Sequence, residues 1–369
     1  MKNISILGIA TALALGHTVT HSATQLSDSV TFSGFGTLGY VAADTDEGKF
    51  RRESQPDGAG TSGSLKVDSI LGLQLSYKAT DWLSATVQSL TMQRVNSDMS
   101  TRIEWAYLKA TPIEGLSVRA GRMSMPNFLV SDSRRVGYAN TWLRPANEVY
   151  AVDLLNGGLE GFDVSYRIPL GGNGLTITAL GGKSSVDQYD TSTKVNEVRG
   201  LNVVWDGDGY SVRLGHIEGK PDIGNISLPG GGVVGGTEVY KFTGIGANVD
   251  SHNVVLQAEY VQRRSALLGA VIDANGWYVL GGYRFGSFLP YVQMAKAGPA
   301  DSLAAKQKTT AIGLRWDAFS SAALKFQLER VDTEGTSGYS FATTSTGGGG
   351  SAPVTKPVNV FSVALDFVF

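Results

Sequence analysis

The feature that most constrains the fold is a period of two in the hydrophobic pattern, which recurs along most of the chain. In residues 65–77 the odd positions read Leu, Val, Ser, Leu, Leu, Leu and Tyr, whereas the even positions are mostly polar or Gly. Successive side chains of a β-strand point to opposite faces, so this pattern places one face in apolar surroundings and the other in water. The C-terminal segment repeats the pattern, with one face formed by Phe361, Val363, Leu365, Phe367 and Phe369.

About sixteen such segments follow one another, from 30–43 and 64–77 to 356–369, and many have the ~10-residue length of a tilted membrane strand. Their connections alternate between tight turns and longer segments such as 44–63, 123–158 and 185–196. This alternation is typical of an outer-membrane barrel and has no explanation in a soluble sandwich. The sequence therefore predicts an all-β, transmembrane antiparallel β-barrel with short periplasmic turns and long extracellular loops.

Composition narrows the alternatives. Only 17% of the residues are charged, below the ~25% of soluble domains, yet after Leu15 no segment reaches the ~18 apolar residues of a membrane helix. The 33 acidic and 31 basic residues nearly cancel, which disfavours a nucleic-acid partner. With no cysteine, the chain has neither disulfides nor a thiolate metal site.

The N-terminus has the pattern of a secretory signal peptide. A short basic start that contains Lys2 precedes about twelve apolar residues, Ile4 to Leu15, which are too few to span a bilayer. We expect cleavage after Ala23. The predicted organisation is a signal peptide over 1–23 and a single barrel over 24–369.

Three stretches together resemble the Gram-negative outer-membrane porin superfamily. They are the first strand at 30–40, the segment 119–150 (RAGRMSMPNFLVSDSRRVGYANTWLRPANEVY) and the alternating strand that ends at Phe369. The Pro-Glu-Phe-Gly-Gly sequence of many general porins is absent. The resemblance implies a sixteen-stranded barrel in the cell outer membrane, surrounded by lipid and lipopolysaccharide and assembled as a homotrimer. It also implies that loop 123–158 folds into the lumen as a constriction and that Phe369 is the signal read by the barrel-assembly machinery.

The predicted pore combines charges of both signs. In strand 159–168 the apolar alternation faces lipid and leaves Asp163 and Arg167 inside, and the same reading places further bases on the wall. Because bases outnumber acids at these wall positions, we expect a weak anion preference. An alternative is that salt bridges pin the loop to the wall without affecting selectivity. The residues predicted to line the pore or its constriction are Arg119, Asp132, Arg134, Arg135, Arg144, Glu148, Asp163, Arg167, Arg213, Arg284 and Arg315.

Other motifs are weaker. Residues 34–39 match G-x-G-x-x-G, but they lie inside an alternating strand, where glycine permits close packing, and not before a helix. Residues 44–48 lack the twelfth-position acid of a calcium loop, and only His216 and His252 follow the signal segment. We therefore expect no enzyme, cofactor or metal, and predict passive diffusion of small hydrophilic solutes and ions. The alternatives are a substrate-selective channel for one anion or metabolite, and a surface adhesion or receptor barrel.

Overall fold

The computed structural model describes residues 23–369 except 54, 95–97, 154–156, 189–190, 228–232, 238, 337 and 344–353. The predicted signal segment 1–23 therefore lies outside the described residues apart from Ala23. Within the described part of the chain, no helix is long and apolar enough to cross a membrane.

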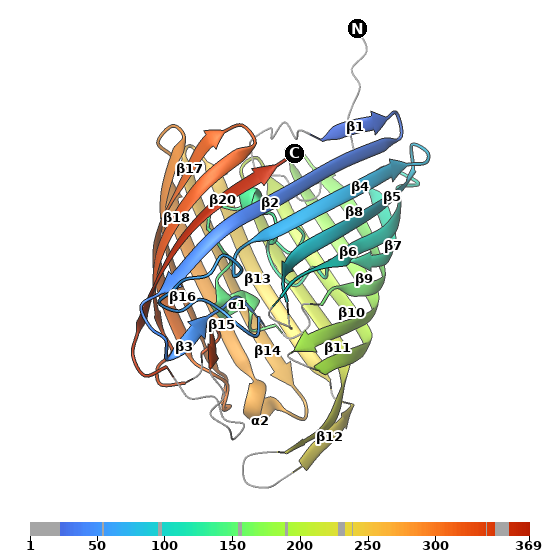
Figure 1. The fold of residues 1–369 in the computed structure, drawn as a ribbon. Coiled ribbons are helices and arrows are strands. Elements are labelled where there is room, and N and C mark those ends of the chain that lie inside the picture. The colour runs from blue at the N-terminus through green and yellow to red at the C-terminus, as the bar shows by residue number, and fades with distance from the viewer. Residues whose placement is uncertain are drawn as a thin grey trace.

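The fold is a closed antiparallel barrel of sixteen strands, as predicted (Figure 1). Each strand pairs with its neighbours in chain order, and β20 pairs with β2 to close the ring. The barrel strands are β2 (Val30–Ala43), β4 (Ile70–Lys78), β5 (Leu83–Gln93), β6 (Met99–Ala110), β7 (Leu116–Met123), β8 (Leu159–Leu170), β9 (Asn173–Gln188), β10 (Thr191–Gly207), β11 (Tyr210–Ser227), β13 (Tyr240–Ser251), β14 (Val254–Ser265), β15 (Ala274–Tyr283), β16 (Phe288–Pro299), β17 (Gln307–Phe319), β18 (Ala322–Asp332) and β20 (Val358–Val368).

Short strands and helices outside the sixteen barrel strands lie near the two ends of the barrel. At the end with tight turns, where the C-terminus lies, β1 (Thr24–Ser27) pairs with β2 (Figure 1). At the opposite end, β12 (Val233–Thr237) pairs with the last residues of β11, and β3 (Gly48–Phe50) pairs with β19 (Phe341–Thr343). The remaining elements are the 3-10 turn η1 (Gly137–Ala139) and the short helices α1 (Asn147–Tyr150) and α2 (Gly269–Ile272). We call these two ends the turn end and the loop end.

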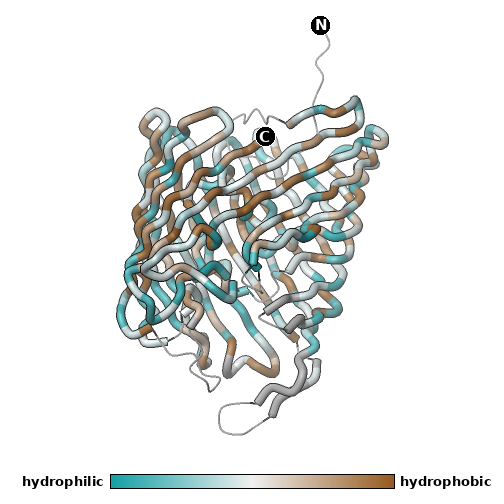
Figure 2. Tube along the Cα trace, viewed as in Figure 1, coloured by the Kyte–Doolittle hydropathy of each residue, from teal (hydrophilic) through white to brown (hydrophobic). Residues whose placement is uncertain are grey.

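Alternating burial follows the alternating sequence. Along β16, Phe288, Val292 and Met294 are exposed on the outside, whereas Leu289 and Tyr291 between them are buried. The alternation of polar and apolar residues along the strands is visible in Figure 2. Because a barrel strand presents one face to lipid and the other to the interior, this pattern explains how so little charge can make a membrane protein.

Close packing where β2 pairs with β20 explains the glycines of β2. The backbone of Phe369 exchanges hydrogen bonds of 2.7 and 2.9 Å with Gly34. The rings of Phe369 and Phe367 lie over Gly34 and Gly36, so a Cβ at either glycine would overlap a ring. The G-x-G-x-x-G match is thus a close-packing feature of a β-strand.

Several strands differ from the sequence-based boundaries, and two segments show why. Residues 64–69, predicted as the start of a strand, precede β4, because Asp68 and Val67 turn inward and are buried at 1% exposure. Segment 185–196, predicted as a loop, is largely a continuation of the β9–β10 hairpin. Its polar Ser and Thr residues carry no alternating apolar signal, so periodicity could not reveal these pairs.

Candidate pore constriction

In the connection between β7 and β8, the described residues 124–153 and 157–158 contact inward-facing side chains of the barrel wall. Its apolar residues Met125, Phe128, Val149 and Tyr150 pack in one buried cluster with residues of β8–β11 and β13–β16, including Leu180 and Tyr278. We call the inward faces of β11 and β13–β20 the clamped wall, and those of β4–β9 the open wall. The loop is held by polar contacts to the clamped wall.

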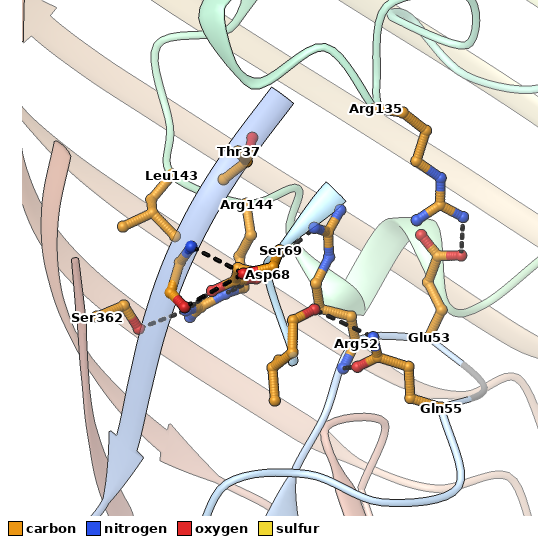
Figure 3. A network of polar contacts seen from close by, with 12 residues as sticks. Thr37, Arg52, Glu53, Gln55, Asp68, Ser69, Arg135, Leu143, Arg144 and Ser362 are labelled. Carbon is orange, nitrogen blue, oxygen red and sulfur yellow. Dashed lines mark hydrogen bonds and ion pairs between the residues drawn. The ribbon is translucent and has the colours of Figure 1, made fainter. Parts of the chain in front are cut away.

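Arg144 is the centre of the largest polar contact (Figure 3). Its guanidinium donates to Asp68 Oδ2 at 2.6 Å, and also to Glu329 on β18 and Ser362 on β20. Arg144 is 1% exposed and lies 4.9 Å from the Phe50 ring centroid. Burial favours the neutral form, but the charges of Asp68 and Glu329 outweigh it and raise the pKa of Arg144. Arg144 therefore contacts the wall and not open space.

Lys325 on β18 makes the second contact. Its ammonium donates to the carbonyls of Gly137, Asn140 and Trp142 at 2.7, 2.7 and 3.0 Å, and lies 2.9 Å from Asp366 on β20. Three carbonyls of one loop therefore converge on one buried cation. Such convergence fixes the path of a segment that has little regular structure.

Two predicted arginines also hold the loop through its carbonyls. Arg315 on β17 donates to the carbonyls of Tyr138 and Asn140, each at 2.8 Å, and Arg213 on β11 donates to the carbonyl of Pro126. Arg213 is 3% exposed. The clamped wall thus supplies hydrogen-bond donors to backbone carbonyls along much of the length of the loop.

Glu148, in α1, is buried at 2% exposure. Gln307 and Thr309 on β17 both donate to its Oε1, the first at 2.7 Å. No cation forms a salt bridge with it among the residues described. Burial consequently raises the pKa of Glu148 above its ordinary value.

Loop 44–63 also enters the lumen, which the sequence did not reveal. Glu53 forms a 2.7 Å salt bridge with Arg135, and Arg52 lies 3.6 Å from Asp68, so this loop joins the same polar network (Figure 3). Burial alone would raise the pKa of Glu53, but the charges of Arg135, Arg134 and Arg52 lower it to about 2. The only feature of the sequence that points to this inward contact of loop 44–63 is the run of three charged residues at 51–53.

On its opposite side, the loop borders a recess that lies between the loop and the open wall. The wall contributes residues such as Gln88, Glu104 and Trp105, and the loop contributes Asp132, Arg134 and Arg135. Charges of both signs therefore border the recess.

Four further predicted residues form ion pairs on the barrel wall. Arg119 on β7 donates to Asp163 on β8, with its Nε 3.0 Å from Oδ2. Nearer the turn end, Arg167 pairs with Asp206 at 2.7 Å and Arg284 with Asp250 at 2.8 Å. These contacts balance the arginines locally, so the wall is less cationic than a count of bases suggests.

A comparison with protein-family models matches residues 10–336 to the Gram-negative porin family. No curated protein sequence matches the chain.

Several solved structures share the fold. OmpF of Salmonella typhi, in complex with daunomycin, aligns with a TM-score of 0.61 at 14% identity, covering 94% of this chain and 100% of its own. A loop-deletion mutant of OmpT, an outer membrane protein of Vibrio cholerae, gives 0.59 at 11% identity, with 93% and 100% covered. The anion-selective porin of Comamonas acidovorans gives 0.56 at 16% identity, with 92% and 99% covered. The family match, which spans most of the chain, and the closed sixteen-stranded barrel lead to one conclusion: this chain belongs to the Gram-negative porin family, and it is a β-barrel of the outer membrane.

Proposed function

We propose that the barrel is a water-filled channel for passive diffusion of small hydrophilic solutes and ions, without a chemical step. The observation that carries this proposal is the asymmetric position of loop 124–158, which is held on the clamped wall and leaves the recess beside the open wall. A channel selects by its radius and by the charges that line it. The solute path would therefore run between the loop and β4–β9.

The charges beside this path support a weak preference for anions. Arg134 and Arg135 on the loop lie across the recess from Glu104 on β6, and Arg119 is 21% exposed beside its partner Asp163. Opposite charges across a narrow aqueous path create a transverse field that favours polar solutes. The arginines would add a modest excess of positive charge.

Reversal potential in a salt gradient tests the selectivity. We expect Arg134→Gln to reduce the anion-to-cation permeability ratio about two- to threefold, because a cation bordering the path is removed. Arg284→Gln is the matched control, since Arg284 pairs with Asp250 near the turn end. An unchanged ratio in Arg134→Gln, or an equal change in both variants, would contradict the assignment.

Planar-bilayer conductance of the purified protein tests the function itself. Large ohmic currents that do not saturate with solute concentration are expected. Saturation by one solute would instead support a channel selective for an anion or metabolite. Absence of conductance would support an adhesion or receptor barrel and contradict the proposal.

A further inference from the structure

A carboxylate from loop 44–63 neutralises one of the arginines beside the recess. Glu53 Oε2 accepts a hydrogen bond of 2.7 Å from Arg135 Nη2, and the two side chains are 8% and 14% exposed (Figure 3). Arg135 belongs to loop 124–158 and lines the recess. The positive charge that it brings there is therefore offset by an acid that belongs neither to loop 124–158 nor to a barrel strand.

Glu53 is ionised at neutral pH. Burial alone would raise its pKa, but the charges of Arg135, Arg134 and Arg52 lower the pKa to about 2. Its other carboxylate oxygen, Oε1, is buried and accepts no hydrogen bond from the residues that the structure describes. The charge of Glu53 thus acts chiefly on the arginines of loop 124–158, and Arg135 is the one at hydrogen-bond distance.

A small packed sheet sets the position of Glu53. β3, which ends at Phe50, pairs with β19, and the rings of Phe50 and Phe341 meet edge to face with their centroids 5.9 Å apart. Both side chains are 1% exposed and pack in one cluster with residues of β2, β18 and β20, such as Val331. Glu53 lies three residues beyond the end of β3, so the β3–β19 sheet carries it to the recess.

Asn147 of α1 joins this sheet to loop 124–158. Its Nδ2 donates to the carbonyl of Arg51 and to Ser340 Oγ, each at 2.9 Å. Its Oδ1 accepts a hydrogen bond of 3.4 Å from the backbone N–H of Glu53. Asn147 is 6% exposed. One buried amide therefore contacts the residue after β3, the residue before β19 and the backbone of Glu53.

The backbone of Glu53 has an unusual conformation. Its φ is 45°, in the left-handed region that residues other than glycine rarely adopt. Next to it, the Arg52 N–H donates to Gln55 Oε1 at 3.0 Å, and Gln55 Nε2 donates to the carbonyl of Val67, also at 3.0 Å. Such a conformation is costly and persists where surrounding contacts impose it, most often at functional sites. Here the strained turn directs the Glu53 side chain to Arg135.

We propose that Glu53 is a selectivity-determining residue of the channel: it masks the charge of Arg135 beside the solute path, and displacement of the β3–β19 sheet uncovers that charge and strengthens the preference for anions. The inference rests on the proposed function, because it takes the recess as part of the solute path. A channel selects through the charges that line it, so one ion pair at this place tunes selectivity. Loops at the loop end are thereby coupled to the constriction.

Reversal potential in a salt gradient, measured with the full-length protein in planar bilayers, tests the masking. We expect Glu53→Gln to raise the anion-to-cation permeability ratio about two- to threefold, because the charge of Arg135 is no longer offset. Glu53→Asp keeps the negative charge and should stay near the parent ratio. Arg135→Gln leaves the carboxylate without its partner and should lower the ratio by a similar factor.

The double variant Glu53→Gln/Arg135→Gln separates masking from a simple loss of positive charge. It removes both charges together, leaves neither alone, and should return the ratio to that of the parent protein. It also keeps the test valid should Glu53→Gln not assemble. A ratio lowered in the double variant, as expected for Arg134→Gln, would overturn the proposal. Shifts of the same sign in Glu53→Gln and Arg135→Gln would do so too.

Asn147→Ala tests the link between the β3–β19 sheet and selectivity. Loss of the amide should move the ratio in the direction of Glu53→Gln by a smaller factor, and should have no further effect in the Glu53→Gln background. Asn173→Ala is the matched control, because it removes an amide that accepts a 2.9 Å hydrogen bond from Tyr210 at the turn end. Equal shifts in Asn147→Ala and Asn173→Ala, or none in Asn147→Ala, would contradict the link.

The same recordings distinguish this inference from the proposed function. A parent protein that carries no current would contradict both. A conducting parent protein whose permeability ratio is the same in Glu53→Gln would overturn the inference alone.

Discussion

The clamped wall and the open wall use charge in opposite ways. Where the loop meets the clamped wall, Arg144 of the loop and Lys325 of β18 are 1% and 0% exposed and are enclosed by carboxylates and loop carbonyls. Beside the open wall, Asp132 and Arg134 border a recess. The difference teaches that charge in this lumen has two roles, since buried pairs position the loop and only the bordering groups are placed to act on solutes.

The largest effect is expected from substitution of Arg144, which makes the largest polar contact between the loop and the clamped wall. Arg144→Ala leaves Asp68 and Glu329 buried without their shared cation, and losing one partner of such a cluster costs about 3–5 kcal/mol. We expect the free energy of unfolding in urea to fall by this amount and single-channel currents to become larger and noisier. Unchanged stability and conductance would show that the loop is not held here.

The next effect is a pH dependence of opposite sign for two buried loop carboxylates. The pKa of Glu53 is lowered to about 2, against 4.5 ordinarily, so its stabilising contribution is present above pH 4.5 and is lost as the pH falls toward 2. This shift corresponds to about 3 kcal/mol. Glu53→Gln should lose that stability at neutral pH, as measured by urea unfolding from pH 3 to 7.

Glu148 should behave in the reverse sense. Its raised pKa means that its contribution is present below pH 4.5 and is lost as the pH rises through the raised value. Glu148→Gln should therefore be more stable than the parent protein at neutral pH, and this advantage should shrink toward pH 4. The same sign of change in Glu53→Gln and Glu148→Gln would contradict the difference between a paired and an unpaired carboxylate.

A smaller effect is expected at a neutral contact of the clamped wall. The Trp142 indole donates to Gln257 at 3.0 Å. Trp142→Phe removes this hydrogen bond and should cost about 1 kcal/mol in urea unfolding. A loss as large as that of Arg144→Ala would show that packing, and not buried charge, holds the loop.

The smallest effect is expected at the turn end. The Arg167 side chain is 49% exposed, so its pair with Asp206 is screened by water. Arg167→Ala should change the free energy of unfolding by less than about 1 kcal/mol. A loss comparable to that of Arg144→Ala would remove the distinction between buried and exposed pairs.

Sequence periodicity predicted the barrel well because each strand repeats the same two-sided environment. Arg119 and Asp163 were placed inside by alternation, and the structure pairs them there. Loops have no such period, so the burial of Arg144 and the inward path of Glu53 could not be read from their neighbours in the chain. Their partners are distant in sequence, as Glu329 is from Arg144.

The central claim, that the path runs along the open wall, is tested most directly by single-cysteine labelling, since the chain has no cysteine of its own. Glu104→Cys borders the recess, whereas Gln293→Cys on the inward face of β16 replaces a side chain that is 2% exposed. We predict that a charged, water-soluble thiol reagent modifies Glu104→Cys in open channels and lowers their current, and leaves Gln293→Cys unmodified. Rapid modification and block of Gln293→Cys, with no effect on Glu104→Cys, would contradict the account.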